Sequence, residues 1–146
     1  MSTKSARRRS REFALQGLYA WLLSGCGDGD QTGQFADARG FDKCDKDFFL
    51  SLLRGTTGAA AELEALLQPL IDRKLQALSP VERAILMLAA WELKSSDEVP
   101  YRVVINEAVE LAKTYGGTDG HKYVNGVLDK LARSLRAEPG EAAPQS

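Results

Sequence analysis

The chain has few of the residues that build metal sites and disulfide frameworks, with two cysteines and one histidine among 146 residues. Cys26 and Cys44 do not form a CxxC pair, so we expect two inert thiols rather than a metal site or a disulfide. Long apolar runs are also lacking. The longest, from Ala84 to Trp91, is far shorter than the roughly 20 residues of a membrane-spanning helix. Because no convincing secretory cleavage site follows the basic N-terminus, we expect a cytoplasmic protein, without a bound metal or cofactor.

Strand-like alternation of apolar and polar residues is absent, whereas apolar residues recur at helical spacing in every long segment. We therefore predict a single all-α domain over residues 1–136. Its N-terminal subdomain would cover about residues 5–76 and its C-terminal subdomain about residues 79–136. Helices are expected at about residues 5–24, 80–94, 100–115 and from about 119 onward, with two or three further helices over residues 45–54 and 57–76. Residues 25–43, rich in glycine and aspartate, predict a loop with at most a short helix around residues 34–38, and residues 137–146 predict a disordered tail.

The sharpest local signal is the segment Ser79-Pro80-Val81-Glu82. Serine at the N-cap, proline at the first helical position and glutamate at the third form a capping box, so a helix must start here. The helix carries apolar residues on all of its faces, which predicts that it is the central, most buried helix. Pro69 is expected to end or kink the helix before it, because proline lacks a backbone N–H.

No set of residues in the sequence predicts catalysis. Glu107 and Glu110 lie three apart on a helix without a neighbouring histidine, so we interpret them as part of a solvated helix face. Gly116-Gly117 lacks the lysine and the preceding strand of a phosphate-binding loop. His121 is as compatible with a plain surface histidine as with contact to a ligand. We therefore expect a protein that is not an enzyme.

Positive charge is concentrated at one end of an almost neutral chain. The first eleven residues carry five basic side chains and no acid, although the formal net charge of the whole chain is −1. Four arginines of this cluster lie on or beside the first turns of a helix: Arg7, Arg8, Arg9 and Arg11. A local basic cluster on a neutral body is typical of a protein that grips a polyanion, and arginine binds phosphate bidentately.

A second candidate site is the segment from Tyr115 to Tyr123. It combines the start of a helix, which favours anions, with two tyrosines that could stack on unpaired bases. Lys122 adds positive charge, and Asp119 is an acceptor that could recognise base amino groups. The alternative is purely structural: Asp119 would be an N-cap and the tyrosines half-buried packing residues. Together with the arginines, the segment describes a basic, aromatic-lined groove for single-stranded nucleic acid.

Four blocks of the sequence together carry a resemblance to a known family: Ala6–Glu12, Gln16–Trp21, Val99–Lys113 and His121–Lys130. In this order they are similar to blocks of the NusB family of bacterial transcription antitermination factors. The resemblance implies an all-α fold of about seven helices in two small packed bundles. It also implies binding to the boxA element of nascent RNA, chiefly in ribosomal RNA operons, together with NusE, a small-subunit ribosomal protein. The pair would help load an antitermination complex onto RNA polymerase.

The resemblance also assigns roles to individual residues. Arg8, Arg9 and Arg11 match the family's basic RNA contacts. A second part of the RNA surface would consist of Tyr115, Asp119, Lys122 and Tyr123. Tyr19 and Glu82 match positions implicated in binding NusE, and Glu82 is also the capping-box residue, so its role stays open between the two. Because family members are either monomers or homodimers, a homodimer stays open as well.

Two other functions compete with a sequence-selective RNA adaptor. One is a helical interaction module whose main partner is a protein, with only non-specific affinity for RNA. The other is a helix-turn-helix DNA-binding protein. It is the weaker alternative, because the basic residues cluster at the first helix rather than along a recognition helix. A preference for boxA RNA over a scrambled RNA of equal length would favour the adaptor.

Overall fold

The computed structural model describes residues 3–24, 35 and 37–136, and within these ranges it contains helices and no strands. The prediction of an all-α fold is confirmed, with six α-helices against about seven expected. Their bounds are α1 Thr3–Leu23, α2 Lys46–Gly58, α3 Ala60–Leu67, α4 Pro80–Ser95, α5 Tyr101–Tyr115 and α6 Gly120–Leu135. Three short 3₁₀-helices lie between them: η2 Phe41–Lys43, η3 Gln68–Leu70 and η4 Leu75–Ala77. Cys26, most of the predicted loop and the predicted tail lie outside the described residues.

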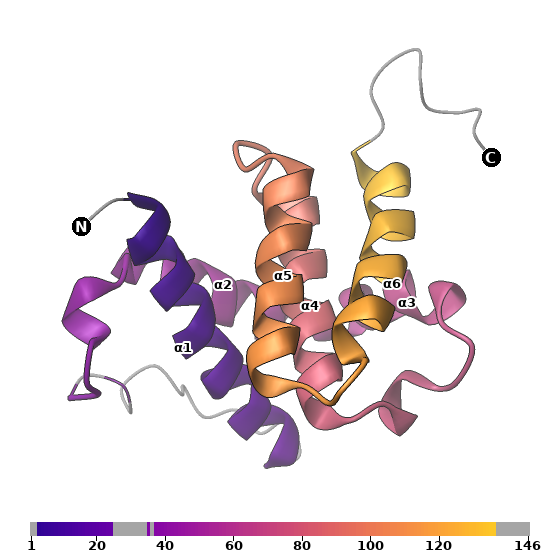
Figure 1. Cartoon of the computed structure of the whole chain (residues 1–146), viewed down its shortest axis with the longest axis horizontal. Helices are drawn as coiled ribbons and strands as arrows, with labels where there is room; N and C mark the ends of the chain where they lie inside the picture. The colour runs from indigo at the N-terminus through magenta and orange to yellow at the C-terminus, as the bar shows by residue number, and fades with distance from the viewer. Residues whose placement is uncertain (1–2, 25–34, 36, 137–146) are drawn as a thin grey trace.

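Helix α4 is the centre of the molecule, as its sequence predicts. Ser79 is the N-cap, and its hydroxyl accepts a hydrogen bond from the Glu82 backbone N–H at 3.2 Å, with Pro80 at the first helical position. Every residue from Ala84 to Ala90 is buried. Helix α4 therefore contacts all five other α-helices, and Figure 1 shows it behind α5, between α1 and α6.

Helix α3 ends just before Pro69, as expected from the sequence, but the observed helix bounds differ from those predicted over residues 45–54 and 57–76. Helix α2 continues to Gly58, α3 ends at Leu67, and Pro69 lies in the 3₁₀-helix η3. Proline cannot donate to the helical ladder and its ring clashes with the preceding turn, so an α-helix does not continue through it. The Gln68 side chain then holds the following turn, because it donates to the Arg73 carbonyl at 2.8 Å and accepts from the Leu75 N–H at 3.0 Å.

Helices α2 and α4 approach each other closely at Gly55. A Cβ added at this glycine would overlap the indole ring of Trp91 on α4, at Cε2 and Cζ2, more closely than packed atoms can approach. The absence of a side chain at this position therefore sets how near the two helices come.

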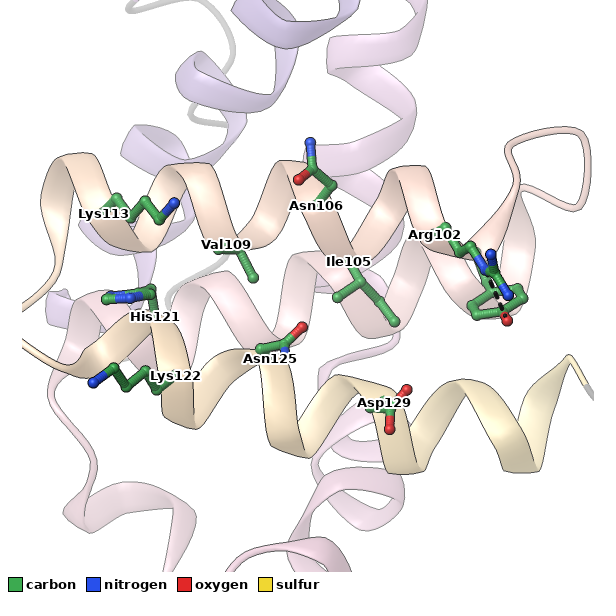
Figure 2. A pocket seen from close by; sticks show the side chains of 10 residues that line it. Arg102, Ile105, Asn106, Val109, Lys113, His121, Lys122, Asn125 and Asp129 are labelled. Atoms are coloured by element: carbon green, nitrogen blue, oxygen red, sulfur yellow. Dashed lines mark hydrogen bonds between the residues drawn. The ribbon is translucent and has the colours of Figure 1, made fainter. Parts of the chain in front are cut away.

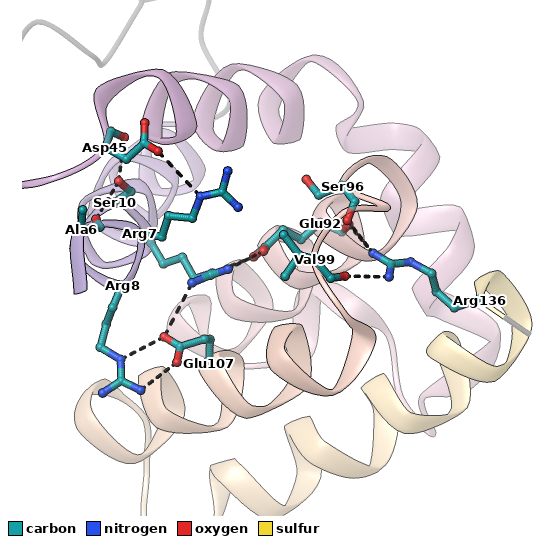
Figure 3. Close-up of polar contacts among 11 residues, drawn as sticks. Ala6, Arg7, Arg8, Ser10, Asp45, Glu92, Ser96, Val99, Glu107 and Arg136 are labelled. Carbon is teal, nitrogen blue, oxygen red and sulfur yellow. Dashed lines mark hydrogen bonds and ion pairs between the residues drawn. The ribbon is translucent and has the colours of Figure 1, made fainter. Parts of the chain in front are cut away.

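Arg136, the last residue that the structure describes, caps the C-terminal end of α4. The Arg136 guanidinium donates to the backbone carbonyls of Leu93, Ser96 and Val99 at 2.7, 2.9 and 2.8 Å. Carbonyls at a helix C-terminus have no partner within the helix, and a cation placed there also complements the helix dipole. Arg136 thereby links the end of α6 to the end of α4 (Figure 3).

A continuous hydrophobic core extends from Phe13 on α1 to Ala132 on α6. The division into two subdomains, at about residues 5–76 and 79–136, stays a prediction. In the described part of the chain, no helix combines the length and apolarity needed to cross a bilayer.

Candidate nucleic-acid interface

Arg11, one of the four predicted RNA-binding arginines, points into the protein. Its guanidinium donates to both carboxylate oxygens of Glu92 on α4, at 2.9 and 2.7 Å, and both side chains are buried. This bidentate pair joins α1 to the central helix. Arg11 as an RNA contact stays a prediction, although its charge is directed away from the surface.

Arg8 forms a second bidentate pair, with Glu107 on α5 at 3.0 and 2.7 Å. The interpretation of Glu107 as part of a solvated face is wrong, because this carboxylate is only 3% exposed. Burial by itself would raise the pKa of Glu107, but the hydrogen bonds from Arg8 and the charges of Arg11 and Arg8 outweigh it. The pKa therefore lies below its ordinary value of 4.5. Arg11 Nη1 also lies 3.7 Å from Glu107 Oε1, and Figure 3 shows Glu107 facing Arg8.

Arg7 shares a side of α1 with Arg11, because both guanidiniums lie over the Phe48 ring, whereas Arg9 lies on another side. The Arg7 guanidinium lies 4.4 Å from the centre of the Phe48 ring and 3.7 Å from the carboxylate of Asp45, which caps the start of α2. Arg9 is half-buried, beside the 3₁₀-helix η2, and has no acidic partner among the described residues. The arginines therefore fan out to different neighbours instead of forming one exposed patch.

The acids that meet these arginines were missed by reasoning from the sequence. Glu92 carried a usable signal, since a single acid inside the most apolar helix seldom lies buried without a partner. Glu107 carried a weaker signal of the same kind, because Val104 and Leu111, which share its face of α5, are apolar. Only the crossing of α1 over α5 places Arg8 opposite it.

The turn between α5 and α6 exposes three of the predicted site residues. Tyr115 is 42% exposed, and Lys122 and Asp119 are exposed and 3.5 Å apart between Nζ and Oδ1. Asp119 occupies the N-cap position of α6, but its side chain makes no capping hydrogen bond. Partial burial, and then the charge of Glu12 on α1, raise the pKa of the Tyr115 hydroxyl, which places this turn beside α1.

Tyr123, the other predicted aromatic, lies farther along α6 and is half-buried. Its hydroxyl donates to Asp72 Oδ1 at 3.4 Å, and the Arg73 guanidinium lies 5.4 Å from its ring centre. Glu82 on α4 lies beside the first residue of α6, because a Cβ added at Gly120 would be 2.5 Å from Glu82 Oε2. Glu82, a predicted partner residue, is therefore close to the start of α6, where Asp119 and Lys122 are predicted RNA residues.

Tyr19, the second predicted partner residue, lies on the last part of α1. It is 36% exposed, and Leu23 on the same helix is 59% exposed, so this part of α1 presents apolar surface. The end of α1, the start of α4 and the α5–α6 turn all lie along the lower edge of the molecule in Figure 1. The elements that carry the predicted site residues therefore converge at one edge, apart from the arginine-bearing first turns of α1.

No cluster of potential metal ligands occurs in residues 3–24, 35 and 37–136. The fold and its surface define a small all-α protein with Tyr115, Asp119 and Lys122 exposed at and beside the α5–α6 turn. The model of the NusB family matches residues 8–133, and the chain belongs to this family. It is accordingly a transcription antitermination factor and not an enzyme.

Individual relatives agree with this assignment over almost the whole chain. The transcription antitermination protein NusB of Paraburkholderia phytofirmans is 57% identical over 140 residues, which cover 96% of this chain and 97% of the relative. The protein of the same name from Aromatoleum aromaticum is 59% identical over 136 residues, covering 93% and 94%. Among solved structures, NusB of T. maritima matches with a TM-score of 0.76 and 30% identity, covering 87% of this chain and 90% of that one.

Proposed function

We propose that this protein binds the boxA element of nascent RNA together with the ribosomal protein NusE, and so helps assemble an antitermination complex on RNA polymerase. The observation that carries the proposal is the exposed set Tyr115, Asp119 and Lys122 at the α5–α6 turn. Sequence-specific RNA recognition targets unpaired bases, which stack on aromatic rings while cations hold the phosphates. Tyr115, at the end of α5, and Lys122, in the first turn of α6, would supply one of these contacts each.

The arginines of α1 would contribute unequally to this surface. The Arg8 side chain is 45% exposed and keeps donor capacity beyond its pair with Glu107, and Arg9 has no competing acid among the described residues. Arg7 is shared with Asp45, and Arg11 is buried. We therefore propose that Arg8 and Arg9 contact phosphate, with Arg7 at the margin.

NusE would bind at the edge that carries Tyr19 and Glu82. Tyrosine is a common interface anchor because it combines a rigid apolar face with a polar tip. The exposed Leu23 adds apolar surface one helical turn away. On this proposal Tyr19→Ala weakens binding to NusE more than binding to RNA alone, which calorimetry with purified NusE would measure. An equal affinity of the variant and the wild type for NusE would place the interface elsewhere.

The central test compares boxA RNA with a scrambled RNA of equal length at fixed salt, with and without NusE. We expect the wild type to prefer boxA, and Tyr115→Ala and Lys122→Gln to weaken that binding. Lys122→Gln should also reduce the slope of log affinity against log salt by roughly 0.7, the value for one phosphate contact on a single strand. Lys130→Gln is the matched control, because it removes one exposed charge from the same helix.

Lys122 is a cleaner probe than Arg8. Removing Arg8 would also take the bidentate partner from the buried Glu107, so a loss of binding could reflect a loosened α1. If the wild type binds boxA and scrambled RNA equally well, the alternative of a helical protein-interaction module with non-specific RNA affinity replaces this proposal.

A further inference from the structure

A groove of about 610 Å³ runs between α5 and α6 and is separate from the contacts of α1. Its walls come from both helices, as Figure 2 shows for most of the side chains that line it. None of the resemblances in the sequence assigns it a ligand. Its long axis follows α5 from Arg102 to Lys113, a span of roughly 16 Å along the helix at about 1.5 Å per residue.

The charge in this groove is predominantly positive. Lys113, His121 and Lys122 lie together at one end, and Arg102 lies at the other (Figure 2). Asp129 is the single acid among the lining residues, and Arg133 already binds its carboxylate at 2.7 Å. Outside the lining, Glu110 and Asp119 lie 3.5 Å from Lys113 and Lys122, in exposed pairs that a phosphate can replace. An anionic ligand would therefore meet cations at both ends of the groove.

The middle of the groove combines apolar and amide side chains. Ile105 and Val109 lie on α5 and face Asn125 on α6, and Asn106 also lines the groove. No hydrogen bond ties the Asn125 amide to another described residue. A carboxamide carries two N–H donors and an acceptor oxygen, so it can pair with the edge of a nucleobase. The carboxylates of an acidic peptide only accept hydrogen bonds, so they would leave the amide oxygen unused.

We propose that this groove is a second RNA subsite, which holds nucleotides of the single strand adjoining those bound at the α5–α6 turn. The inference rests on the proposed RNA binding, and Lys122 links the two because it belongs to the turn and also lines the groove. Phosphates would lie against Arg102 and Lys113, and a base would meet Asn125 over the apolar floor. Single-stranded RNA suits this site better than an acidic peptide because of the amides and the continuity through Lys122.

The experiment measures the affinity of two labelled RNAs by fluorescence anisotropy: a boxA core, and the same core lengthened at both ends. We expect the wild type to bind the longer RNA severalfold more tightly. Arg102→Gln and Asn125→Ala should reduce that gain to little or nothing while leaving the affinity for the core unchanged. Arg102→Gln should also lower the salt slope for the longer RNA alone, by roughly 0.7. Lys130→Gln, outside the groove on α6, should keep the full gain.

Equal gains in the Arg102 and Asn125 variants and the wild type would overturn the subsite while leaving the proposed function in place. Failure of the wild type to bind either RNA would overturn the proposed function and the subsite together. If Arg102→Gln leaves both RNA affinities unchanged and weakens binding to NusE, the groove is a protein site and the proposal is wrong. Both side chains are exposed, so circular dichroism should show unchanged helical content in the two variants.

Discussion

Replacing Glu92 by glutamine tests whether the buried ion pair anchors α1 to the central helix. In the wild type the carboxylate accepts two hydrogen bonds from Arg11, at 2.9 and 2.7 Å, with side-chain exposures of 7% for Arg11 and 4% for Glu92. The amide of glutamine is neutral and can accept only one of these bonds. Its NH₂ group would face an N–H of the guanidinium, so one donor of Arg11 loses its partner.

The expected cost follows from what remains around Arg11. Removing one partner of a buried ion pair costs about 3–5 kcal/mol, because the other charge is left buried without compensation. Glu107 stays 3.7 Å from Arg11, so part of the charge is still balanced. We therefore expect a loss near the lower limit, about 3 kcal/mol, against a total stability of roughly 5–15 kcal/mol for a domain of this kind.

Urea unfolding followed by circular dichroism would measure this loss. With a slope of about 2 kcal/mol per M, a loss of about 3 kcal/mol lowers the midpoint by about 1.5 M. Glu62→Gln is the control, since Glu62 pairs with Lys94 at 3.1 Å but is 55% exposed, and should cost less than about 1 kcal/mol. Equal effects of Glu92→Gln and Glu62→Gln would refute the reasoning.

A double variant separates the ion pair from any RNA contact of Arg11. Replacing Arg11 and Glu92 together by methionine removes both buried charges and keeps much of the volume, so most of the lost stability should return. If Arg11 serves the fold alone, this double variant should also bind boxA RNA as the wild type does. A salt slope lowered by roughly 0.7 would instead place Arg11 on a phosphate.

Three further predictions concern packing, pH and the α5–α6 turn. Gly55→Ala should destabilise the protein by about 1–3 kcal/mol, because its Cβ would overlap Trp91. Gly126→Ala, with open space around it, should instead stabilise α6 by about 0.5–1 kcal/mol, and thermal unfolding of the two variants would show the difference. Since the pKa of Glu107 is lowered in the folded state, its contribution is complete well above the ordinary value of 4.5 and is lost as the pH falls through the folded pKa. Urea titrations between about pH 6 and pH 3 should show this fall, reduced in Glu107→Gln. Asp119→Asn should tighten RNA binding, because it removes a negative charge beside the phosphates. Neither Asp119→Asn nor Asp119→Ala should change the thermal midpoint much, because Asp119 makes no capping hydrogen bond. An unchanged RNA affinity of Asp119→Asn would remove Asp119 from the site.

Local features of the sequence determined most of the helical fold. Three such features act through neighbours in the chain: the Ser79 N-cap followed by Pro80, the apolar surface of α4, and the apolar stripe of Val124, Val127 and Leu128 on α6. Their consequences for helix start and burial therefore follow without knowledge of the tertiary structure. The break at Pro69 is of the same kind, although the helix predicted there extends well beyond the end of α3 at Leu67.

For the candidate site, the sequence predicted which residues take part but not how they are arranged. The sequence singled out Tyr115 and Lys122, which are exposed, and Tyr19, whose role in partner binding stays a prediction. It treated the arginines of α1 as one basic surface. The tertiary structure decided otherwise, because neighbouring residues on a helix point in different directions. Arg8 and Arg11 thus meet Glu107 and Glu92 from helices 99 and 81 residues away in the chain.

The groove between α5 and α6 belongs wholly to the tertiary structure. Arg102 and Asn125 come from different helices, and nothing in the order of residues along either helix shows that they line one space. Periodicity determines which side of each helix is buried, but the way two helices pack determines which exposed residues end up facing each other. In this protein the sequence therefore specified the helices and their buried faces, while the packing of the helices decided which charges are neutralised and which remain free to bind.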